Sequence, residues 1–108
     1  MITYVTELTS DNFKNSIESN SVVLVDIHAS WCGPCKMLSP IIDEVGAHFG
    51  SSVLVGKLDA DAHTEVVKEL GVRNIPTVLI YKDGEIVDRF VGVKNKNEIT
   101  QLVEKHLS

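Results

Sequence analysis

Apolar and polar positions divide the chain into alternating strand-like and helix-like segments. Residues 22–27 and 53–58 are mostly β-branched and aliphatic, which is the pattern of strands buried on both faces in a parallel sheet. Residues 4–8 alternate in character and predict a shorter strand. These three segments therefore predict the first half of a sheet.

A hairpin is predicted in the second half of the chain. Residues 77–81 and 85–91 are rich in strand-forming side chains, and the Asp83-Gly84 dipeptide lies between them. Such a dipeptide is a strong signal for a two-residue turn. We therefore expect these two strands to be antiparallel neighbours.

Four amphipathic segments predict helices. Thr9, Ser10 and Asp11 offer capping side chains for the first helix, which would pack Phe13 and Ile17. The apolar stripes of the other three helices consist of Met37, Leu38, Ile41, Ile42, Val45 and Phe49; of Val66, Val67 and Leu70; and of Ile99, Leu102, Val103 and Leu107.

Boundary residues define the second and fourth helices. Pro34 suits a first helical position, where a missing N–H costs nothing. Pro40 predicts a kink within the same helix, and Gly50 would end it. Asn95 with Glu98 resembles a capping box at the start of the last helix.

The order of elements is β-α-β-α-β-α-β-β-α, which predicts an α/β fold with a single mixed sheet and helices on both faces. Residues 1–108 are expected to form one domain, because a chain of this length buries about two-thirds of its unfolded surface. In open sheets of this class, sites lie outside the carboxyl ends of the strands. Asp26 and the loop from Cys32 to Cys35 both follow the end of the second strand, so we expect the site there.

Composition and charge exclude several classes of function. A hydrophobic fraction of 44% and a charged fraction of 23% are those of a folded globular protein. The net charge of −5 argues against a nucleic-acid partner. The longest apolar run, residues 22–25, is too short to span a membrane, so no membrane association is expected. The first seven residues lack the features of a signal peptide, which predicts a cytoplasmic location.

The most informative motif is the pair Cys32 and Cys35, the only two cysteines. Two thiols on the first turn of a helix can pass between dithiol and disulfide with little movement, whereas closing so short a loop stabilises a fold by only roughly 2 kcal/mol. The helix N-terminus favours a thiolate on Cys32. Cys35, one turn further in, should be more covered and react second. The sequence thus predicts thiol–disulfide exchange in which Cys32 attacks and Cys35 resolves.

Zinc binding is the alternative for this pair. A closed zinc site needs four ligands, and the four histidines show no suitable spacing. We therefore expect no metal, although a dimer that shares thiolates across an interface stays possible on sequence grounds.

The residues between the cysteines bear on the direction of electron flow. Gly33 allows a tight turn, and Pro34 offers neither a positive charge nor an N–H donor to hold down a thiolate. The reduced form is then less stabilised, which favours a reductant over an oxidant.

Asp26 and Lys57 are candidates for proton transfer. Burial of the Asp26 carboxyl in an apolar strand would raise its pKa, so that it could serve Cys35 as a general base. Lys57 could face it from the adjacent strand. The alternatives are an acid that meets solvent at a strand end and an ordinary strand-end lysine.

Two further features predict a contact surface. Trp31, the only tryptophan, adjoins the nucleophile, where it could form a contact surface or fill the core. Ile75-Pro76 precedes a strand, and X-Pro bonds are cis in only about 5–6% of cases. A cis bond would leave the backbone of Ile75 free to pair with an extended client segment.

These residues together resemble the thioredoxin family, and the resemblance runs the length of the chain. It rests on Val25-Asp26, Ala29, Trp31-Cys32-Gly33-Pro34-Cys35-Lys36-Met37, Pro40, Lys57, Ile75-Pro76-Thr77 and Gly92. It implies a thioredoxin fold and a protein-disulfide reductase in which Cys32 attacks and Cys35 resolves. It also implies that Asp26 handles the proton beside Lys57, and that Pro76 follows a cis bond. The client-binding surface it implies consists of Trp31, Gly33, Pro34, Ile75, Pro76, Val91 and Gly92.

The resemblance also implies the partners. These are a flavin-dependent, NADPH-driven thioredoxin reductase and client proteins that carry disulfides. The protein itself is expected to hold no cofactor and to be a monomer.

The sequence departs from the family at several positions. Ile27 and His28 stand where relatives usually carry aromatic residues. A charged His28 near Cys32 would make the protein a weaker reductant, whereas a neutral, hydrogen-bonded His28 would only fill space. Ala60 and Asn74 also differ, which bears on client preference.

Two rival functions remain at this point. One is an oxidase or isomerase on the same fold, which a redox potential would distinguish. The other is a non-catalytic module that docks a partner through Trp31 and Ile75-Pro76, with little use of the thiols.

Overall fold

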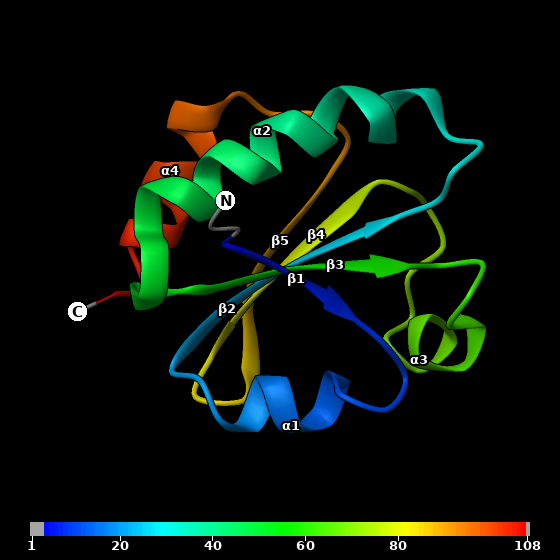
Figure 1. Cartoon of the computed structure of the whole chain (residues 1–108), viewed down its shortest axis with the longest axis horizontal. Coiled ribbons are helices and arrows are strands. Elements are labelled where there is room, and N and C mark those ends of the chain that lie inside the picture. The colour runs from blue at the N-terminus through cyan, green and yellow to red at the C-terminus, as the bar shows by residue number, and fades with distance from the viewer. Residues whose placement is uncertain (1–3, 108) are drawn as a thin grey trace.

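A mixed five-stranded sheet forms the centre of the molecule (Figure 1). The computed structural model describes residues 4–107. Met1 to Thr3, which belong to the segment in which no signal peptide is predicted, lie outside the described residues. The strands are β1 (Val5–Leu8), β2 (Val22–His28), β3 (Leu54–Asp59), β4 (Thr77–Lys82) and β5 (Glu85–Val91), in the spatial order β1-β3-β2-β4-β5. β1 and β2 run parallel to β3, and β4 runs antiparallel to β2 and β5. The predicted mixed sheet is therefore confirmed.

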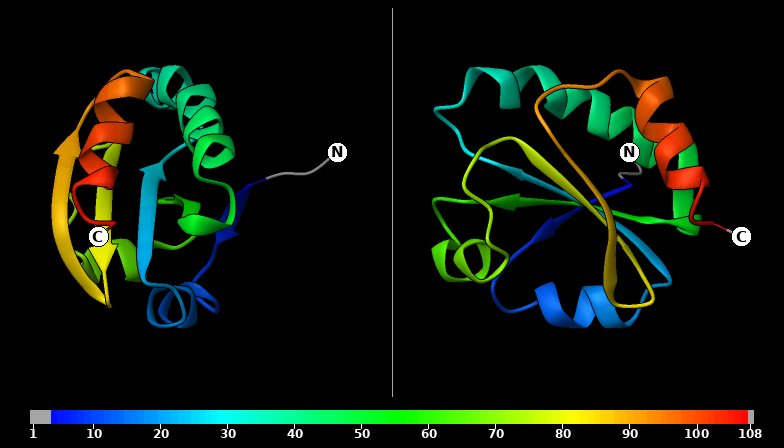
Figure 2. Two further views of the ribbon diagram at one scale, coloured as in Figure 1. Left: turned by 90° about the vertical axis from the view of Figure 1, so that its left-hand side faces the viewer. Right: turned by 180° about the vertical axis from the view of Figure 1, so that it is seen from behind.

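Helices cover both faces of the sheet. They are α1 (Phe13–Glu18), α2 (Gly33–Phe49), α3 (Thr64–Glu69) and α4 (Lys96–Glu104), with a short 3-10 turn over Gly50–Ser52. α2 and α4 lie over one face and α1 and α3 over the other (Figures 1 and 2). The predicted order of elements is correct. No helix in the described part of the chain is long and apolar enough to cross a membrane.

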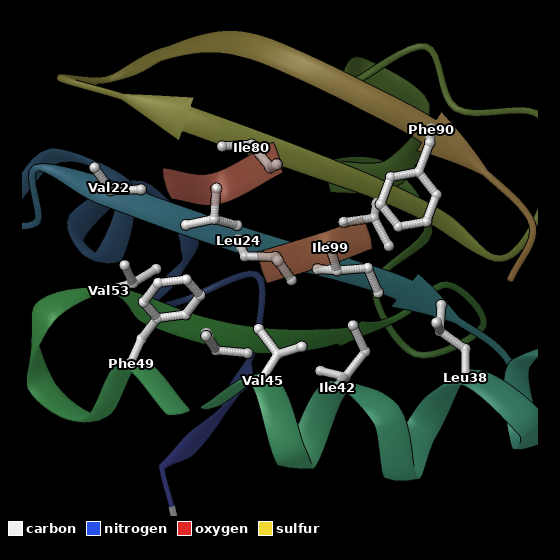
Figure 3. Close-up of a cluster of buried hydrophobic side chains, with 13 residues drawn as sticks. Val22, Leu24, Leu38, Ile42, Val45, Phe49, Val53, Ile80, Phe90 and Ile99 are labelled. Atoms are coloured by element: carbon white, nitrogen blue, oxygen red, sulfur yellow. The ribbon is translucent and has the colours of Figure 1, made fainter. Parts of the chain in front are cut away.

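The larger core lies between the sheet and the α2–α4 layer. Figure 3 shows Leu38, Ile42, Val45 and Phe49 of α2 directed at the sheet, with Ile99 of α4 beside them. Two predicted core residues are wrong, because the side chains of Met37 and Leu107 are 66% and 38% exposed. Met37 falls between the buried residues Cys35 and Leu38 of α2 but outside the buried stripe, and Leu107 follows the end of α4.

β2 is buried on both faces, and its alternation decides where Asp26 lies. Val22 and Leu24 pack in the α2–α4 core, whereas Val23 and Val25 pack in a second core on the α1–α3 side. Because side chains alternate along a strand, Asp26 continues the series of Val22 and Leu24. Its carboxyl therefore lies on the side of the sheet that α2 covers.

The predicted capping box, helix end and hairpin turn are confirmed. Asn95 and Glu98 form the predicted capping box, in which Asn95 Oδ1 accepts a hydrogen bond of 2.8 Å from the Glu98 N–H. α2 ends at Gly50, with φ of 57°. The predicted turn at Asp83-Gly84 joins β4 to β5 with positive φ at both residues.

The predicted cap of α1 is wrong. α1 begins after Asn12, without a side-chain capping bond, and not after the Thr9-Ser10-Asp11 segment. Thr9 and Asn12 instead bond each other: Asn12 Oδ1 accepts from the Thr9 N–H at 2.7 Å, and Thr9 Oγ1 accepts from the Asn12 N–H at 3.2 Å. The same polar residue types therefore form a local turn that competes with helix initiation.

Candidate active site

The two cysteines lie where β2 leads into α2, at the carboxyl end of the central strand. They form a disulfide, with their Cα atoms 5.3 Å apart. Cys32 is the residue that caps α2, and its sulfur accepts a hydrogen bond of 3.2 Å from the Cys35 N–H. Pro34 stands in the first turn, as predicted. The Cys32 sulfur is thus held at the positive end of a 17-residue helix.

The expected difference in cover between the cysteines is not found. Cys32 is 5% exposed and Cys35 is 4% exposed, and both pack with Ala29 and Ile75. In the disulfide form the two sulfurs are joined, so a single pocket of side chains encloses both. The two cysteines differ from each other in the hydrogen bond to the Cys32 sulfur and in their positions on the helix.

The carboxyl of Asp26 is buried in the sheet. Its side chain is 1% exposed, and neither carboxyl oxygen has a hydrogen-bond partner among residues 4–107. Burial raises the pKa of Asp26 to about 7; the charge of Lys57 opposes this rise and that of Asp43 adds to it. The reading of Asp26 as a solvent-exposed strand end is therefore wrong.

Lys57 lies beside Asp26 in the strand register, as predicted. Its ammonium group, however, bonds to α2: Nζ donates to Ser39 Oγ at 2.7 Å and to Asp43 Oδ1 at 2.8 Å. The sequence reading missed both acceptors. Their spacing of four residues on one helix was the available signal, and Cys35, four residues before Ser39, belongs to the same series.

His28 lies two residues beyond Asp26, at the end of β2. It is half-buried, and no hydrogen bond to its ring is found among the described residues. Burial is the main cause that lowers the pKa of His28 below 6.5, and Lys57 contributes in the same direction, while Asp59 and Glu7 oppose it. The neutral form is therefore favoured, as the space-filling interpretation requires, but the hydrogen bond expected with it is absent.

Two segments distant in sequence meet beside the cysteines. The Ile75-Pro76 bond is cis, as the resemblance implies, and Ile75 packs against both cysteines. The Gly92 N–H donates a hydrogen bond of 2.9 Å to the Pro76 carbonyl. β4 and β5 therefore bring residues 75–76 and 91–92 to the same end of the sheet as the disulfide.

The predicted client-binding residues differ in exposure. Trp31 is 69% and Val91 is 59% exposed, and Gly33 and Pro34 are exposed as well. Ile75 and Gly92 are partly covered, and Pro76 is buried, so its side chain contributes little surface. Trp31 is not core filler: its Nε1 donates to Asp61 Oδ2 at 2.8 Å, a partner that the sequence reading missed.

A polar pocket of about 430 Å³ adjoins this site. Its charged and titratable lining consists of Glu7, His28, Asp43, Lys57, Asp59 and His63. It contains Lys57 but neither cysteine. Within residues 4–107, no three His, Cys, Asp or Glu side chains are grouped closely enough to bind a metal ion.

Comparisons with known proteins agree with this geometry. The family model described as Thioredoxin matches residues 4–105. A thioredoxin of Chlamydia caviae is 43% identical over 99 residues, which cover 92% of this chain and 95% of that protein. A mutant thioredoxin from Halobacterium salinarum has a TM-score of 0.88 at 30% identity, over 96% of this chain and 91% of its own. Thioredoxin of Malassezia sympodialis has a TM-score of 0.88 at 29% identity, over 99% and 94%.

The resemblance and the fold predicted from the sequence are thereby confirmed. The similarity covers almost the whole chain, and the two cysteines that carry the motif are joined as a disulfide. The chain belongs to the thioredoxin family: it is a thiol–disulfide oxidoreductase that reduces disulfides of client proteins through Cys32-Gly33-Pro34-Cys35.

Proposed function

We propose that Cys32 is the nucleophile of this reduction and Cys35 the resolving thiol. The observation that carries the assignment is the hydrogen bond from the Cys35 N–H to the Cys32 sulfur at the start of α2. The donor and the helix N-terminus both stabilise a thiolate on Cys32. Within residues 4–107, only the Cys32 sulfur accepts such a bond, so Cys35 stays a thiol until it is deprotonated.

The reaction then has two exchange steps. The Cys32 thiolate attacks one sulfur of a client disulfide; a Cys32–client bond forms, the client disulfide breaks, and the first client thiolate leaves. Cys35 then loses its proton to the Asp26 carboxylate and attacks the Cys32 sulfur. The Cys32–Cys35 bond forms, the Cys32–client bond breaks, and the second client thiolate leaves and takes a proton from solvent. Two electrons pass to the client.

Asp26 suits this proton transfer because a base works best when its pKa is near the working pH. The pKa of Asp26, at about 7, meets that condition. Lys57, next to Asp26 in the strand register, would stabilise the carboxylate electrostatically.

Single replacements of the cysteines test these roles in insulin reduction driven by dithiothreitol. Cys32→Ser should abolish reduction down to the rate with dithiothreitol alone. Cys35→Ser should accumulate a mixed disulfide with insulin, visible by mass spectrometry. A trapped adduct on Cys35 in Cys32→Ser would reverse the assignment. A biological activity that survives both replacements would favour the docking module.

The client surface is proposed to consist of Trp31, Gly33, Pro34 and Val91, with Ile75 and Gly92 at its partly covered centre. Trp31 and Val91 are the strongly exposed apolar residues among them, and Ile75 packs against both cysteines. Aromatic side chains often dominate binding at such surfaces. Trp31→Ala should raise KM for insulin about tenfold while kcat falls less. Ile86→Ala is the matched control, because Ile86 is also exposed but lies at the far end of β5. Equal effects of both variants would contradict this surface.

We also propose the cellular setting. A flavin-dependent, NADPH-driven thioredoxin reductase would return Cys32 and Cys35 to the dithiol, and the protein would work in the cytoplasm. Use of its only two cysteines as a redox pair is typical of reducing compartments. A monomer is expected, because a second subunit on the surface of Trp31 and Val91 would exclude clients. NADPH oxidation coupled to a purified reductase and sedimentation analysis test these points.

A further inference from the structure

Lys57 is held away from the carboxyl that it would be expected to pair with. Asp26 is its neighbour in the β2–β3 register, yet both Asp26 oxygens lack a hydrogen-bond partner among residues 4–107. The ammonium group instead donates to Ser39 Oγ at 2.7 Å and to Asp43 Oδ1 at 2.8 Å. Two acceptors on α2 therefore occupy a cation that would otherwise be free to pair with Asp26.

The helix places these acceptors in a row with the resolving cysteine. Cys35, Ser39 and Asp43 follow at intervals of four residues, so they lie along neighbouring positions of one helix face. The Lys57 side chain is 21% exposed and that of Asp43 is 59% exposed. Ser39 is partly buried. The bond to Ser39 thus lies on the inner side, close to the sheet, and the bond to Asp43 lies nearer to solvent.

We propose that Ser39 and Asp43 are positioning residues of the redox reaction: by holding Lys57 Nζ against α2, they leave the Asp26 carboxyl unpaired. The proposal rests on the role of Asp26 as proton acceptor for Cys35. Ser39 acts through hydrogen bonding alone. Asp43 acts both through its bond to Lys57 and through its own negative charge.

The charges around Lys57 support this assignment. Glu7 stands opposite it in the β1–β3 register, and Asp59, His28 and His63 line the same pocket. Because Glu7 and Asp59 also attract the ammonium group, Lys57 is drawn toward the pocket and away from Asp26. On its other side, Asp26 has the apolar Val78 of β4 as its register partner.

Release of Lys57 should make Asp26 a stronger acid. An opposite charge that moves to within 4–6 Å lowers the pKa of a carboxyl by about 1–3 units. The pKa of Asp26 is held near 7 mainly by burial, with Lys57 lowering it and Asp43 raising it. Loss of Ser39 or Asp43 therefore shifts the pKa of Asp26 in the same direction, downward, and the effect of Asp43 is the larger because its own charge is also lost.

The first experiment is a titration of the oxidised protein. Carbon NMR of labelled aspartate carboxyls follows Asp26 in the wild type, Ser39→Ala and Asp43→Asn. We expect the midpoint to move from about 7 to roughly 6 in Ser39→Ala, and further in Asp43→Asn. Glu44→Gln controls for charge, since Glu44 is the exposed neighbour of Asp43 on α2. Ser16→Ala controls for the side chain, since Ser16 is a partly buried helical serine of α1, as Ser39 is of α2. Unchanged midpoints in both test variants would overturn the proposal.

The second experiment measures the resolving step. Reduced protein mixed with dithiobis(nitrobenzoate) releases thionitrobenzoate twice, first on attack by Cys32 and then on resolution by Cys35. A midpoint near 6 means that about fivefold more Asp26 is ionised at pH 6 than in the wild type. The second release at pH 6, relative to its plateau at high pH, should rise by about that factor in Ser39→Ala. A pH profile identical to that of the wild type would count against the proposal.

A double replacement separates this inference from the function it rests on. In a Lys57→Gln background, Ser39→Ala should no longer move the Asp26 midpoint, because the cation through which it acts is gone. A shift that persists there refutes the positioning role. Asp26→Asn reports separately on the proposed function. If it leaves the pH profile of the second release unchanged, Asp26 is not the base; if it removes the profile while Ser39→Ala has no effect, only the positioning role fails.

Discussion

Two aspartates of the sheet have carboxyl groups in opposite environments. Asp26, on β2 beside the disulfide, is buried without a hydrogen bond to any residue of the described range 4–107, and its pKa is raised to about 7 by burial. Asp88, on β5 beneath the end of α4, accepts hydrogen bonds from His106 Nε2 at 3.2 Å and from the Arg89 N–H at 3.1 Å, with Lys105 Nζ at 3.6 Å. Burial alone would raise the pKa of Asp88, but these partners together lower it.

The two carboxyl groups have opposite effects on the stability of the folded state. A buried carboxyl without partners destabilises the folded state once it ionises, and in return it titrates where a general base is useful. The Asp88 carboxylate, through its hydrogen bond to His106 and its ion pair with Lys105, fastens the end of the C-terminal helix to the sheet. Its lowered pKa keeps it ionised throughout the physiological range. On the role proposed for Asp26, the redox region serves proton transfer, whereas the β5–α4 junction serves stability.

Asp26→Asn should have the largest effect on stability. In the folded state the pKa of Asp26 is about 7, against an ordinary value of 3.8. Below pH 4 the carboxyl is neutral in both folded and unfolded chains. Between pH 4 and 7 only the unfolded chain ionises, so the wild type loses stability, by about 4 kcal/mol in total at 1.36 kcal/mol per pH unit. The asparagine variant would escape this loss, because its amide does not ionise, and urea unfolding at pH 4, 6 and 8 measures the difference.

The pH dependence of the stability gained in Asp26→Asn identifies its cause. The variant and the wild type should be similar at pH 4, and the variant should be the more stable by a growing margin up to pH 7, with no further change above it. Asp11→Asn, at an exposed position, supplies the charge-matched control. A gain of the same size at pH 4 and pH 8 would mean that ionisation of Asp26 is not its cause.

The sequence predicted the two regions to different extents. The order of elements along the chain, the hairpin, the capping box and the cysteine pair follow from local periodicity and from short motifs, and all were found. The position of Asp26 was predictable too, because a lone acid in a continuous β-branched run of a central strand has no route to solvent.

Long-range contacts of polar side chains were not predictable. The bonds of Lys57 to Ser39 and Asp43, of Trp31 to Asp61 and of Asp88 to His106 join residues between 14 and 30 positions apart. Each depends on how α2, α4 or a loop is placed over the sheet, which no local pattern specifies. The near-equal burial of the two cysteines is likewise a property of the packed site and not of the motif.

Asp88→Asn should have a moderate effect and no effect on the chemistry. Loss of the charged acceptor weakens its bonds to His106 and the Arg89 N–H, and we expect the free energy of unfolding to fall by about 1 kcal/mol near pH 7. Because the pKa of Asp88 is lowered in the folded state, this contribution is present above the ordinary value of 3.8 and disappears as the pH falls through the folded pKa. Urea unfolding measures both.

A matched control keeps this prediction specific. Glu85→Gln removes the same charge from an exposed position of the same strand and should leave stability within about 0.5 kcal/mol of the wild type. Rates of insulin reduction should be equal in all three proteins. A loss of reductase activity in Asp88→Asn would break the separation of the two regions.

His28→Gln should have the smallest effect of these replacements. It tests the second titratable group of the redox region, the imidazole of His28. His106 pairs with Asp88, whereas the His28 ring is half-buried and has no hydrogen-bond partner among residues 4–107. Since burial lowers the pKa of His28 below 6.5, the neutral form predominates at pH 7, and His28 contributes little charge to stabilise the Cys32 thiolate. The redox potential at pH 7 should therefore change by less than about 10 mV, where 30 mV corresponds to 1.4 kcal/mol. A potential that falls by 30 mV or more on replacement would show that His28 carries a charge beside the cysteines. Burial would then not determine the charge of both Asp26 and His28.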